Sequence, residues 1–457
     1  MTDGPGRPGP GPAEATPVRY VADAVVACDR PGHVLRPGVV EVAGDTVTHV
    51  GRSGSTRDDG SVRELRELRV HGALLPGMVN VHCHSPMTLF RGSGENLPLH
   101  RWLDEVLWPQ EAHLTEEDVY WGMSLAAAEL LCFGVTTTCE AYFFGDALAD
   151  AVIDAGSRAQ VTPGVLQLPG QEPAEHWWVA QTEQITDFHR RRHGEGGRIE
   201  VGFAPHAPYT VPLPGLVHIA RAAQDLDALF HIHLAETEDE CRRFTEEHGD
   251  SIPAVLADAG VFDGRVLAAH SVWLSEADID RFRQFDVAVA HCPQSNAKLA
   301  SGVAPLVPLL DAGVRVGLGT DGPASNNDLD LWEELRLAAM LARIRQRDAA
   351  ALPAAAALNL ATRAGGLALG RPDLGVLAPG SRADMLLVRL DDPAFVPLLD
   401  DGQMIEHLVW SASSRLVTDV WVAGVPVVVS QQCLTVDVGR ARREVEERAL
   451  RLRESVR

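Results

Sequence analysis

The sequence predicts an α/β protein, in which eight strand–helix units form a (β/α)8 barrel beside a smaller β unit built from both chain ends. Between residues 76 and 374, short apolar runs alternate with longer helical stretches eight times over about 300 residues. Residues 18–70 and 384–429 instead alternate short strands with turns. Histidine or aspartate follows several apolar runs, at the strand ends where such barrels place their chemistry.

The barrel strands and helices are expected in regular succession along the chain. The eight strand candidates are Met78–Val81, Gly134–Thr138, Ala159–Leu166, Glu200–Phe203, Ala228–His231, Val266–Ala269, Val287–Ala290 and Val314–Leu318. The helices between them include Glu116–Cys132, Ala147–Ala155, Leu216–Leu226 and Ile279–Gln284. Because a local pattern does not prove that a sheet closes, an open doubly wound sheet is the alternative.

These patterns divide the chain into five expected regions. The first is Gly/Pro-rich without an apolar core, which is typical of a disordered lead-in rather than a signal peptide. The regions are a lead-in at 1–17, a first β part at 18–75, the barrel at 76–374, a second β part at 375–435 and a C-terminal helix at 436–457.

Composition narrows the expected partners and compartment. A net charge of −23 argues against nucleic acid as a partner, because phosphate binding requires a basic surface. Seven scattered cysteines without a Cys-x-x-Cys motif favour a reducing, cytoplasmic setting. No uninterrupted apolar stretch reaches the roughly 18 residues of a membrane span, so no membrane association is expected.

The most informative motif is His82-Cys83-His84, at the end of the apolar run Ala73–Val81. Side chains alternate along a strand, so His82 and His84 point to the same face. Two adjacent imidazoles suit a divalent metal such as zinc, which favours nitrogen ligands. With 18 histidines in the chain, one such pair does not by itself establish a metal site.

Four further predicted strands end in residues of the same kind. Strand five runs into His233 and Glu236, strand six into His270, strand seven into His291, and strand eight into Asp321. The carboxyl ends of barrel strands meet at one rim, so these side chains are expected to converge with His82 and His84. The sequence therefore predicts a metal site at that rim.

These motifs together resemble the amidohydrolase superfamily, and within it the mononuclear group of adenosine-type, S-adenosylhomocysteine and triazine deaminases and chlorohydrolases. The resemblance covers about residues 18–430. The supporting motifs are Pro76–Asn80, Met87–Gly92, His291–Asn296 and Gly375–Asp384. The resemblance implies a distorted (β/α)8 barrel with a β-sandwich from both termini, and an enzyme that acts on a small molecule and water. It also implies a homo-oligomer, a dimer or tetramer.

The resemblance assigns His82, His84, His233 and Asp321 as ligands of one Zn²⁺, with Fe²⁺ or Mn²⁺ as alternatives. Related binuclear enzymes bridge two metals with a lysine on strand four, whereas the only lysine here is Lys298, after strand seven. Zinc lowers the pKa of bound water from about 15.7 towards about 7. Glu236, His270 and Asp321 are the expected catalytic residues: Glu236 to carry a proton, the other two to orient the water.

The expected substrate is an amino-substituted heteroaromatic ring, most of all an adenosine-type purine, with ammonia released. Glu111 matches a family glutamate that binds ribose, and His206 matches a histidine near the leaving amino group. Trp177 and Trp178 are candidates to stack on the ring, although loop packing or a dimer contact would also account for them. Family members that deaminate S-adenosylhomocysteine carry an arginine where this chain has Pro163, which puts a substrate bearing an amino acid in doubt.

Two other function classes stay open at this point. Hydrolysis of chloride or an amide on a similar ring is the first alternative, and release of ammonia distinguishes it from deamination. A catalytically inactive scaffold protein is the second, but the chain retains every expected ligand as well as Glu236.

Overall fold

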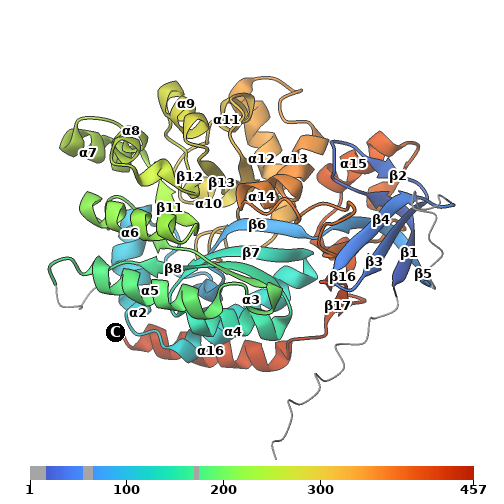
Figure 1. The fold of residues 1–457 in the computed structure, drawn as a ribbon, viewed down its shortest axis with the longest axis horizontal. Coiled ribbons are helices and arrows are strands. Elements are labelled where there is room, and N and C mark those ends of the chain that lie inside the picture. Colours follow the sequence, from blue (N-terminus) through green and yellow to red (C-terminus); the bar gives the residue numbers. More distant parts are fainter. Residues whose placement is uncertain (1–16, 55–64, 169–173, 457) are drawn as a thin grey trace, which may run out of the picture.

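The computed structural model describes residues 17–54, 65–168 and 174–456. Its order of elements is that of an α/β protein with parallel strands in the middle of the chain (Figure 1). The expected lead-in at 1–17 lies almost entirely outside the described residues. Among those that are described, none of the helices has both the length and the apolar character needed to cross a membrane.

Two parallel sheets form the middle of the chain. The first has the order β10-β8-β7-β6, with β9 paired to β8, and the second has the order β11-β12-β13-β14. Their strands are β6 (Met78–Cys83), β7 (Val135–Tyr142), β8 (Arg158–Val165), β9 (Ile199–Val201), β10 (Ala204–Pro205), β11 (Phe230–Leu234), β12 (Val266–His270), β13 (Ala288–His291) and β14 (Val316–Leu318).

Single parallel bridges join these sheets on both sides. Phe203 is bridged to Phe230 on one side, and Cys83 to Asp321 on the other. The backbone N–H of Asp321 donates to the carbonyl of His82 at 3.1 Å. The chain therefore brings the end of β6 next to the residues that follow β14, although they are far apart in sequence.

Helices follow the parallel strands and surround them (Figure 1). The predicted helix Glu116–Cys132 has the same bounds as α3, whose first turn is fixed by a capping box between Thr115 and Asp118. Helix α9 begins three residues before the predicted Ile279, because Ser275 and Asp278 form a second capping box. The helices of the middle region are α1 (Leu99–Trp102), α2 (Trp108–Glu111), α3 (Glu116–Cys132), α4 (Gly145–Ala155), α5 (Trp178–Arg192), α6 (Leu213–Asp225), α7 (Glu238–His248), α8 (Ile252–Asp258), α9 (Glu276–Gln284), α10 (Pro293–Lys298), α11 (Leu306–Asp311), α12 (Leu331–Gln346), α13 (Ala354–Leu360) and α14 (Arg363–Ala368).

Six short helical turns and two helices near the C-terminus complete the helical elements of the described residues. Helices α1 and α2 are joined without a break by the π-helical turn η2. The remaining helical elements are η1 (Ser85–Phe90), η2 (Leu103–Leu107), η3 (Glu195–Gly197), η4 (Val261–Asp263), η5 (Pro393–Phe395), η6 (Ser414–Leu416), α15 (Asp401–Trp410) and α16 (Val438–Glu454).

Strands from both chain ends meet in one nine-stranded sheet of order β18-β17-β16-β15-β5-β1-β3-β4, with β2 paired to β1. Strand β5 lies between the two halves, parallel to β1 and antiparallel to β15. The strands are β1 (Val18–Val26), β2 (Val34–Leu35), β3 (Gly38–Ala43), β4 (Thr46–Arg52), β5 (Arg66–Pro76), β15 (Met385–Val388), β16 (Val417–Val422), β17 (Val425–Val429) and β18 (Gln432–Cys433).

The apolar run Ala73–Val81 crosses from this sheet into the parallel strands. Strand β5 ends at Pro76 and β6 begins at Met78, the first residue of the predicted strand Met78–Val81. At Gly77 a Cβ atom would collide with the side chain of Thr136, so only glycine fits at the crossing. The buried ion pair between Arg158 and Asp384, with N–O distances of 2.6 and 3.1 Å, further ties β8 to the residues before β15.

Candidate metal centre

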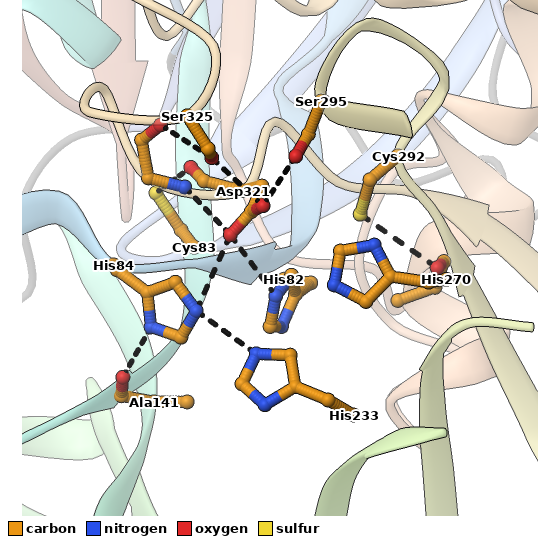
Figure 2. Close-up of polar contacts among 12 residues, drawn as sticks. His82, Cys83, His84, Ala141, His233, His270, Cys292, Ser295, Asp321 and Ser325 are labelled. Atoms are coloured by element: carbon orange, nitrogen blue, oxygen red, sulfur yellow. Dashed lines mark hydrogen bonds and ion pairs between the residues drawn. The ribbon is translucent and has the colours of Figure 1, made fainter. Parts of the chain in front are cut away.

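The histidines and the aspartate predicted from the strand ends lie together at one end of the parallel strands. His82 is in β6, and His84 follows that strand directly. His233 is in β11, His270 ends β12, and Asp321 comes shortly after β14. Figure 2 shows the carboxylate of Asp321 facing the grouped imidazoles.

The ligand atoms of these side chains are close enough to share one ion. Those of His82, His233, His270 and Asp321 all lie within 4.8 Å of one another. His84 is outside this group of four, but its Nε2 lies 3.1 Å from Nε2 of His233 and 3.3 Å from Oδ1 of Asp321. The sequence expected His84 among the four ligands and His270 beside them, whereas the structure places His270 in the tightest group.

The hydrogen bonds of His84 and His233 place a proton on Nδ1 of each ring, so in the neutral form the lone pair is on Nε2, which faces the cluster. Nδ1 of His84 donates to the carbonyl of Ala141, and Nδ1 of His233 donates to the carbonyl of His206 at 2.7 Å. Burial lowers the pKa of His233 well below its usual range, so its ring is neutral and its Nε2 carries a lone pair. Two such nitrogens 3.1 Å apart repel one another unless a cation lies between them.

A chain of hydrogen bonds gives His82 the same tautomer. The Thr162 hydroxyl donates to the carbonyl of Glu140 at 2.8 Å, so its oxygen accepts from Nδ1 of His231 at 3.1 Å. Burial lowers the pKa of His231 well below its usual range, so Nε2 of this neutral ring accepts from Nδ1 of His82 at 2.8 Å. The lone pair of His82 is thereby placed on Nε2.

Nε2 of His82 shows that the cluster fits a metal ion. This atom is buried and has no hydrogen-bond partner among the described residues. It lies 3.4 Å from Oδ1 of Asp321, and burial lowers the pKa of its ring to about 4. A buried polar atom without a partner is costly, and a divalent cation would satisfy it. Imidazole nitrogens with one carboxylate are a donor set that suits zinc.

Asp321 is held so that one of its oxygens faces the histidines. Oδ2 accepts from the hydroxyls of Ser295 at 2.6 Å and Ser325 at 2.8 Å, and Oδ1 accepts from the N–H of Gly322 (Figure 2). Burial alone would raise the pKa of Asp321, but the neighbouring imidazoles, led by His82, hold it well below its usual range. The site therefore contains a permanent negative charge.

Glu236 lies beside the cluster in a buried position. Its Oε1 accepts from the Ser301 hydroxyl at 3.3 Å, and its Oε2 lies 3.8 Å from Nε2 of His270. Burial raises the pKa of Glu236, which favours the protonated form. His270 is oriented by Asn296, whose Oδ1 accepts from Nδ1 at 2.9 Å. A carboxyl with a raised pKa at a metal-binding cluster is suited to proton transfer.

A cavity of about 780 Å³ opens over this cluster. Glu111 and His206, the residues predicted to contact substrate, both line it. Glu111 accepts a hydrogen bond from the Tyr142 hydroxyl at 2.8 Å, and burial raises its pKa to about 7. His206 is neutral because burial lowers its pKa to about 3, and its Nδ1 donates to the Thr210 hydroxyl.

The tryptophan pair is placed differently from the prediction. Trp177 and Trp178 are not among the described residues that line the cavity, where Trp102 and Trp108 are found instead. Trp178 is the first residue of α5 and packs against Gly215 of α6, which leaves room for the indole. Trp108 lines the cavity, and its ring lies 5.8 Å from that of His206.

Three supporting residues were missed or underrated by sequence reasoning. His231, two residues before His233, is not among the predicted site residues, yet it is the hydrogen-bond partner of His82. Buried Glu140 was not singled out, yet it binds both the N–H and the hydroxyl of Ser85, next to His84. Asn80 pairs with Thr320 and so ties β6 to the loop of Asp321.

Comparisons with known proteins agree with this geometry. The model of the amidohydrolase family matches residues 73–427. The 5-methylthioadenosine/S-adenosylhomocysteine deaminase of Pelotomaculum thermopropionicum is 41% identical over 429 residues, 94% of this chain and 97% of that protein. An adenosine deaminase from Xanthomonas campestris with bound zinc superposes with a TM-score of 0.88 at 35% identity, covering 97% of this chain and 100% of that one.

A third similar protein is the atrazine chlorohydrolase of Arthrobacter aurescens complexed with zinc. It has a TM-score of 0.85 and 25% identity, and the match covers 94% of this chain and all of that one. The chain belongs to the amidohydrolase family. This membership confirms the resemblance drawn from the sequence and the expectation of a hydrolase that acts on carbon–nitrogen bonds.

Proposed function

We propose that the protein is a zinc-dependent aminohydrolase that deaminates an adenosine-type purine nucleoside and releases ammonia. The observation that carries this proposal is the group of four histidines and Asp321 beside buried Glu236 at one cavity. The similarity to deaminases of 5-methylthioadenosine, S-adenosylhomocysteine and adenosine supports the choice of ring.

His82, His84, His233 and Asp321 would hold the ion, with His270 beside them. One ion is expected, because the only lysine, Lys298, lies in α10 and interacts with Glu95 and the loop that contains Asn327. Zinc is favoured by the nitrogen-rich donor set and by the zinc in two similar structures, with Fe²⁺ or Mn²⁺ as alternatives. When bound, such an ion lowers the pKa of a coordinated water to about 7.

The chain's own residues would manage the protons. Glu236 is placed to accept a proton from water and pass it to a ring nitrogen, because its raised pKa lets it hold the proton between the two transfers. His270, fixed by Asn296, would orient the water. Asp321, whose Oδ1 faces the imidazoles, would accept the second proton of the attacking water and pass it to the amino group, which leaves as ammonia.

The cavity supplies contacts for the rest of the nucleoside. Glu111 would accept hydrogen bonds from the ribose hydroxyls. His206 would meet the amino group, because its carbonyl already anchors the metal-binding His233. Trp108 would pack on the purine beside His206.

The proposal also covers the closure of the sheets, the region boundaries, the cellular compartment and the oligomeric state. The parallel strands would close into a distorted barrel through the Phe203–Phe230 and Cys83–Asp321 bridges. The nine-stranded sheet of the terminal strands would fold over on itself as a β-sandwich. We retain the division into 18–75, 76–374, 375–435 and 436–457. All seven cysteines are unpaired, in keeping with a cytoplasmic enzyme. A homo-oligomer, a dimer or tetramer, is expected by analogy with similar enzymes.

The proposal is tested by ammonia release from a substrate panel. Purified protein is expected to release one ammonia per turnover from 5′-methylthioadenosine and adenosine. The ultraviolet absorbance should change at the same time, because the adenine ring is converted to a hypoxanthine ring. The same panel includes an aminotriazine and a chlorotriazine, because the similar chlorohydrolase favours that second candidate function. Chloride release without ammonia from any purine would replace the deaminase proposal with the chlorohydrolase one.

Removal of the Thr162 hydroxyl is expected to weaken metal binding about 10- to 100-fold, the usual cost of losing a group that supports a ligand. In Thr162→Val the shape is kept, but the hydrogen bond that sets the tautomer of His231, and through it His82, is lost. Competition against a chelator measures the affinity, and Thr162→Ser, which restores the hydroxyl, should bind like the original protein. Equal affinity in the valine and serine variants would refute this role.

A further inference from the structure

We infer that the cavity selects adenosines whose 5′ substituent is uncharged and discriminates against those whose 5′ tail carries a carboxylate. The inference rests on the proposed deaminase function and goes further, because it separates 5′-methylthioadenosine from S-adenosylhomocysteine, which the relative's name joins. Three observations carry it: the charges in the cavity, the apolar face that leads away from Glu111, and the state of the nearby cations.

Three of the described side chains that line the cavity carry a carboxyl group. They are Glu111, Glu236 and Asp321, and no lysine or arginine is found among the described lining residues. Glu236 and Asp321 belong to the metal centre, where a divalent ion would balance them. Glu111 has only the neutral Tyr142 hydroxyl as its partner. The part of the cavity beyond the metal centre therefore offers no charge to pair with a substrate carboxylate.

An apolar face runs from Glu111 along one helical segment. Residues 99–111 form the continuous run α1, η2 and α2, and Leu99, Trp102, Leu103 and Leu107 all line the cavity. Leu107 precedes Glu111 by one helical turn, so the apolar side chains continue the face on which Glu111 lies. A rise of 1.5 Å per residue extends this face about 18 Å from Glu111 to Leu99. A thioether or alkyl tail beyond the ribose would find apolar contacts along it.

Cations near this segment are already paired with carboxylates. Arg101 donates to both oxygens of Glu105 at 2.7 and 3.0 Å, and this pair is exposed. Arg91 is paired with Glu129 through both of its terminal nitrogens. Asp104 adds a further acidic group to the same helical run.

A carboxylate that enters this cavity would lose water without gaining a cationic partner, and the ionised form of Glu111 would repel it. Two like charges that lie a few ångströms apart in a partly buried site repel one another. Such repulsion lowers the affinity for the substrate about 10- to 100-fold. An apolar tail of the same length avoids both costs and buries surface. The discrimination should therefore depend on charge rather than on the length of the tail.

The test compares three nucleosides on the intact protein: 5′-methylthioadenosine, 5′-butylthioadenosine and S-adenosylhomocysteine. We expect kcat/KM, measured by ammonia release, to be similar for the two uncharged compounds and at least ~10-fold lower for S-adenosylhomocysteine. Equal values for S-adenosylhomocysteine and the butylthio compound would overturn the inference. Failure of all three to release ammonia would instead count against the proposed deaminase function.

A substitution in the cavity tests directly whether the lack of a cationic side chain causes the discrimination against a carboxylate. Gly164 lines the cavity, and a Cβ there would make ordinary contacts of 3.7 to 3.9 Å. Gly164→Arg is expected to raise kcat/KM for S-adenosylhomocysteine relative to 5′-butylthioadenosine about 10-fold, whereas Gly164→Gln, of similar length but neutral, should leave this ratio unchanged. An arginine variant that deaminates 5′-butylthioadenosine yet keeps the original ratio would contradict the inference.

Discussion

Replacing Glu236 with glutamine is expected to lower kcat for the deamination of 5′-methylthioadenosine by at least ~10²-fold, the scale of a lost general acid–base group. Glutamine keeps the shape of the side chain and can still bond to Ser301, which lies 3.3 Å from Oε1. It cannot, however, take up and return a proton. Because Glu236 is not among the grouped ligands, the variant should retain its metal and bind substrate.

Three measurements on the Glu236→Gln variant separate chemistry from structure. Steady-state kinetics give kcat and KM, elemental analysis gives metal content, and thermal unfolding reports on the fold. Glu238→Gln is the matched control, because Glu238 is exposed at the start of α7, two residues further along the chain. A glutamine variant at 236 with undiminished kcat would show that the proton is carried by another group.

The second large effect is expected in His84→Ala, which should lose its metal on dialysis. The ring of His84 is held by the carbonyl of Ala141, and its Nε2 meets both His233 and Asp321. Alanine removes that nitrogen and leaves the remaining imidazoles with one ligand fewer. The purified variant should contain little metal, show no measurable deamination, and unfold at a lower temperature, since a bound ion stabilises the folded state.

The control for this variant is His71→Ala, which removes a largely exposed imidazole from β5. It should keep the metal content and activity of the original protein. Elemental analysis after dialysis against a metal-free buffer decides the question. A His84→Ala protein with as much metal as the control would remove His84 from the ligand set.

The ends of the parallel strands could be predicted from the sequence because two simple rules apply there. The period of two along a strand pairs His82 with His84, and the carboxyl ends of parallel strands gather His233, His270 and Asp321. Both rules need only the order of residues within one strand. The convergence of these side chains follows from the topology and not from any fine detail of packing.

The hydrogen-bonding residues that hold these side chains in place could not be predicted, because their contacts depend on the register between strands. Thr162 of β8 reaches His231 of β11 only once the two parallel sheets have come together, and Glu140 of β7 reaches Ser85 only once β6 and β7 have paired. Strand β7 was expected to end at Thr138 but continues to Tyr142, since Glu140 is a buried polar residue inside the strand. A carboxylate in an apolar run interrupts the pattern by which strands are recognised.

The tryptophan pair shows a different limit of the sequence. Two adjacent aromatic residues suggest a platform for a flat ring, but their identity does not reveal which way they point. Trp178 is instead buried against α6 at Gly215. Trp108, which does line the cavity, belongs to the helical segment of Glu111, and this position could be inferred only from the folded chain.

Anomalous diffraction at the zinc absorption edge, on crystals of the zinc-loaded protein, tests the central claim most directly. One strong peak per chain is expected among His82, His84, His233 and Asp321, about 2.0–2.2 Å from their nitrogen and oxygen atoms. A peak elsewhere, or none at these side chains, would contradict the account.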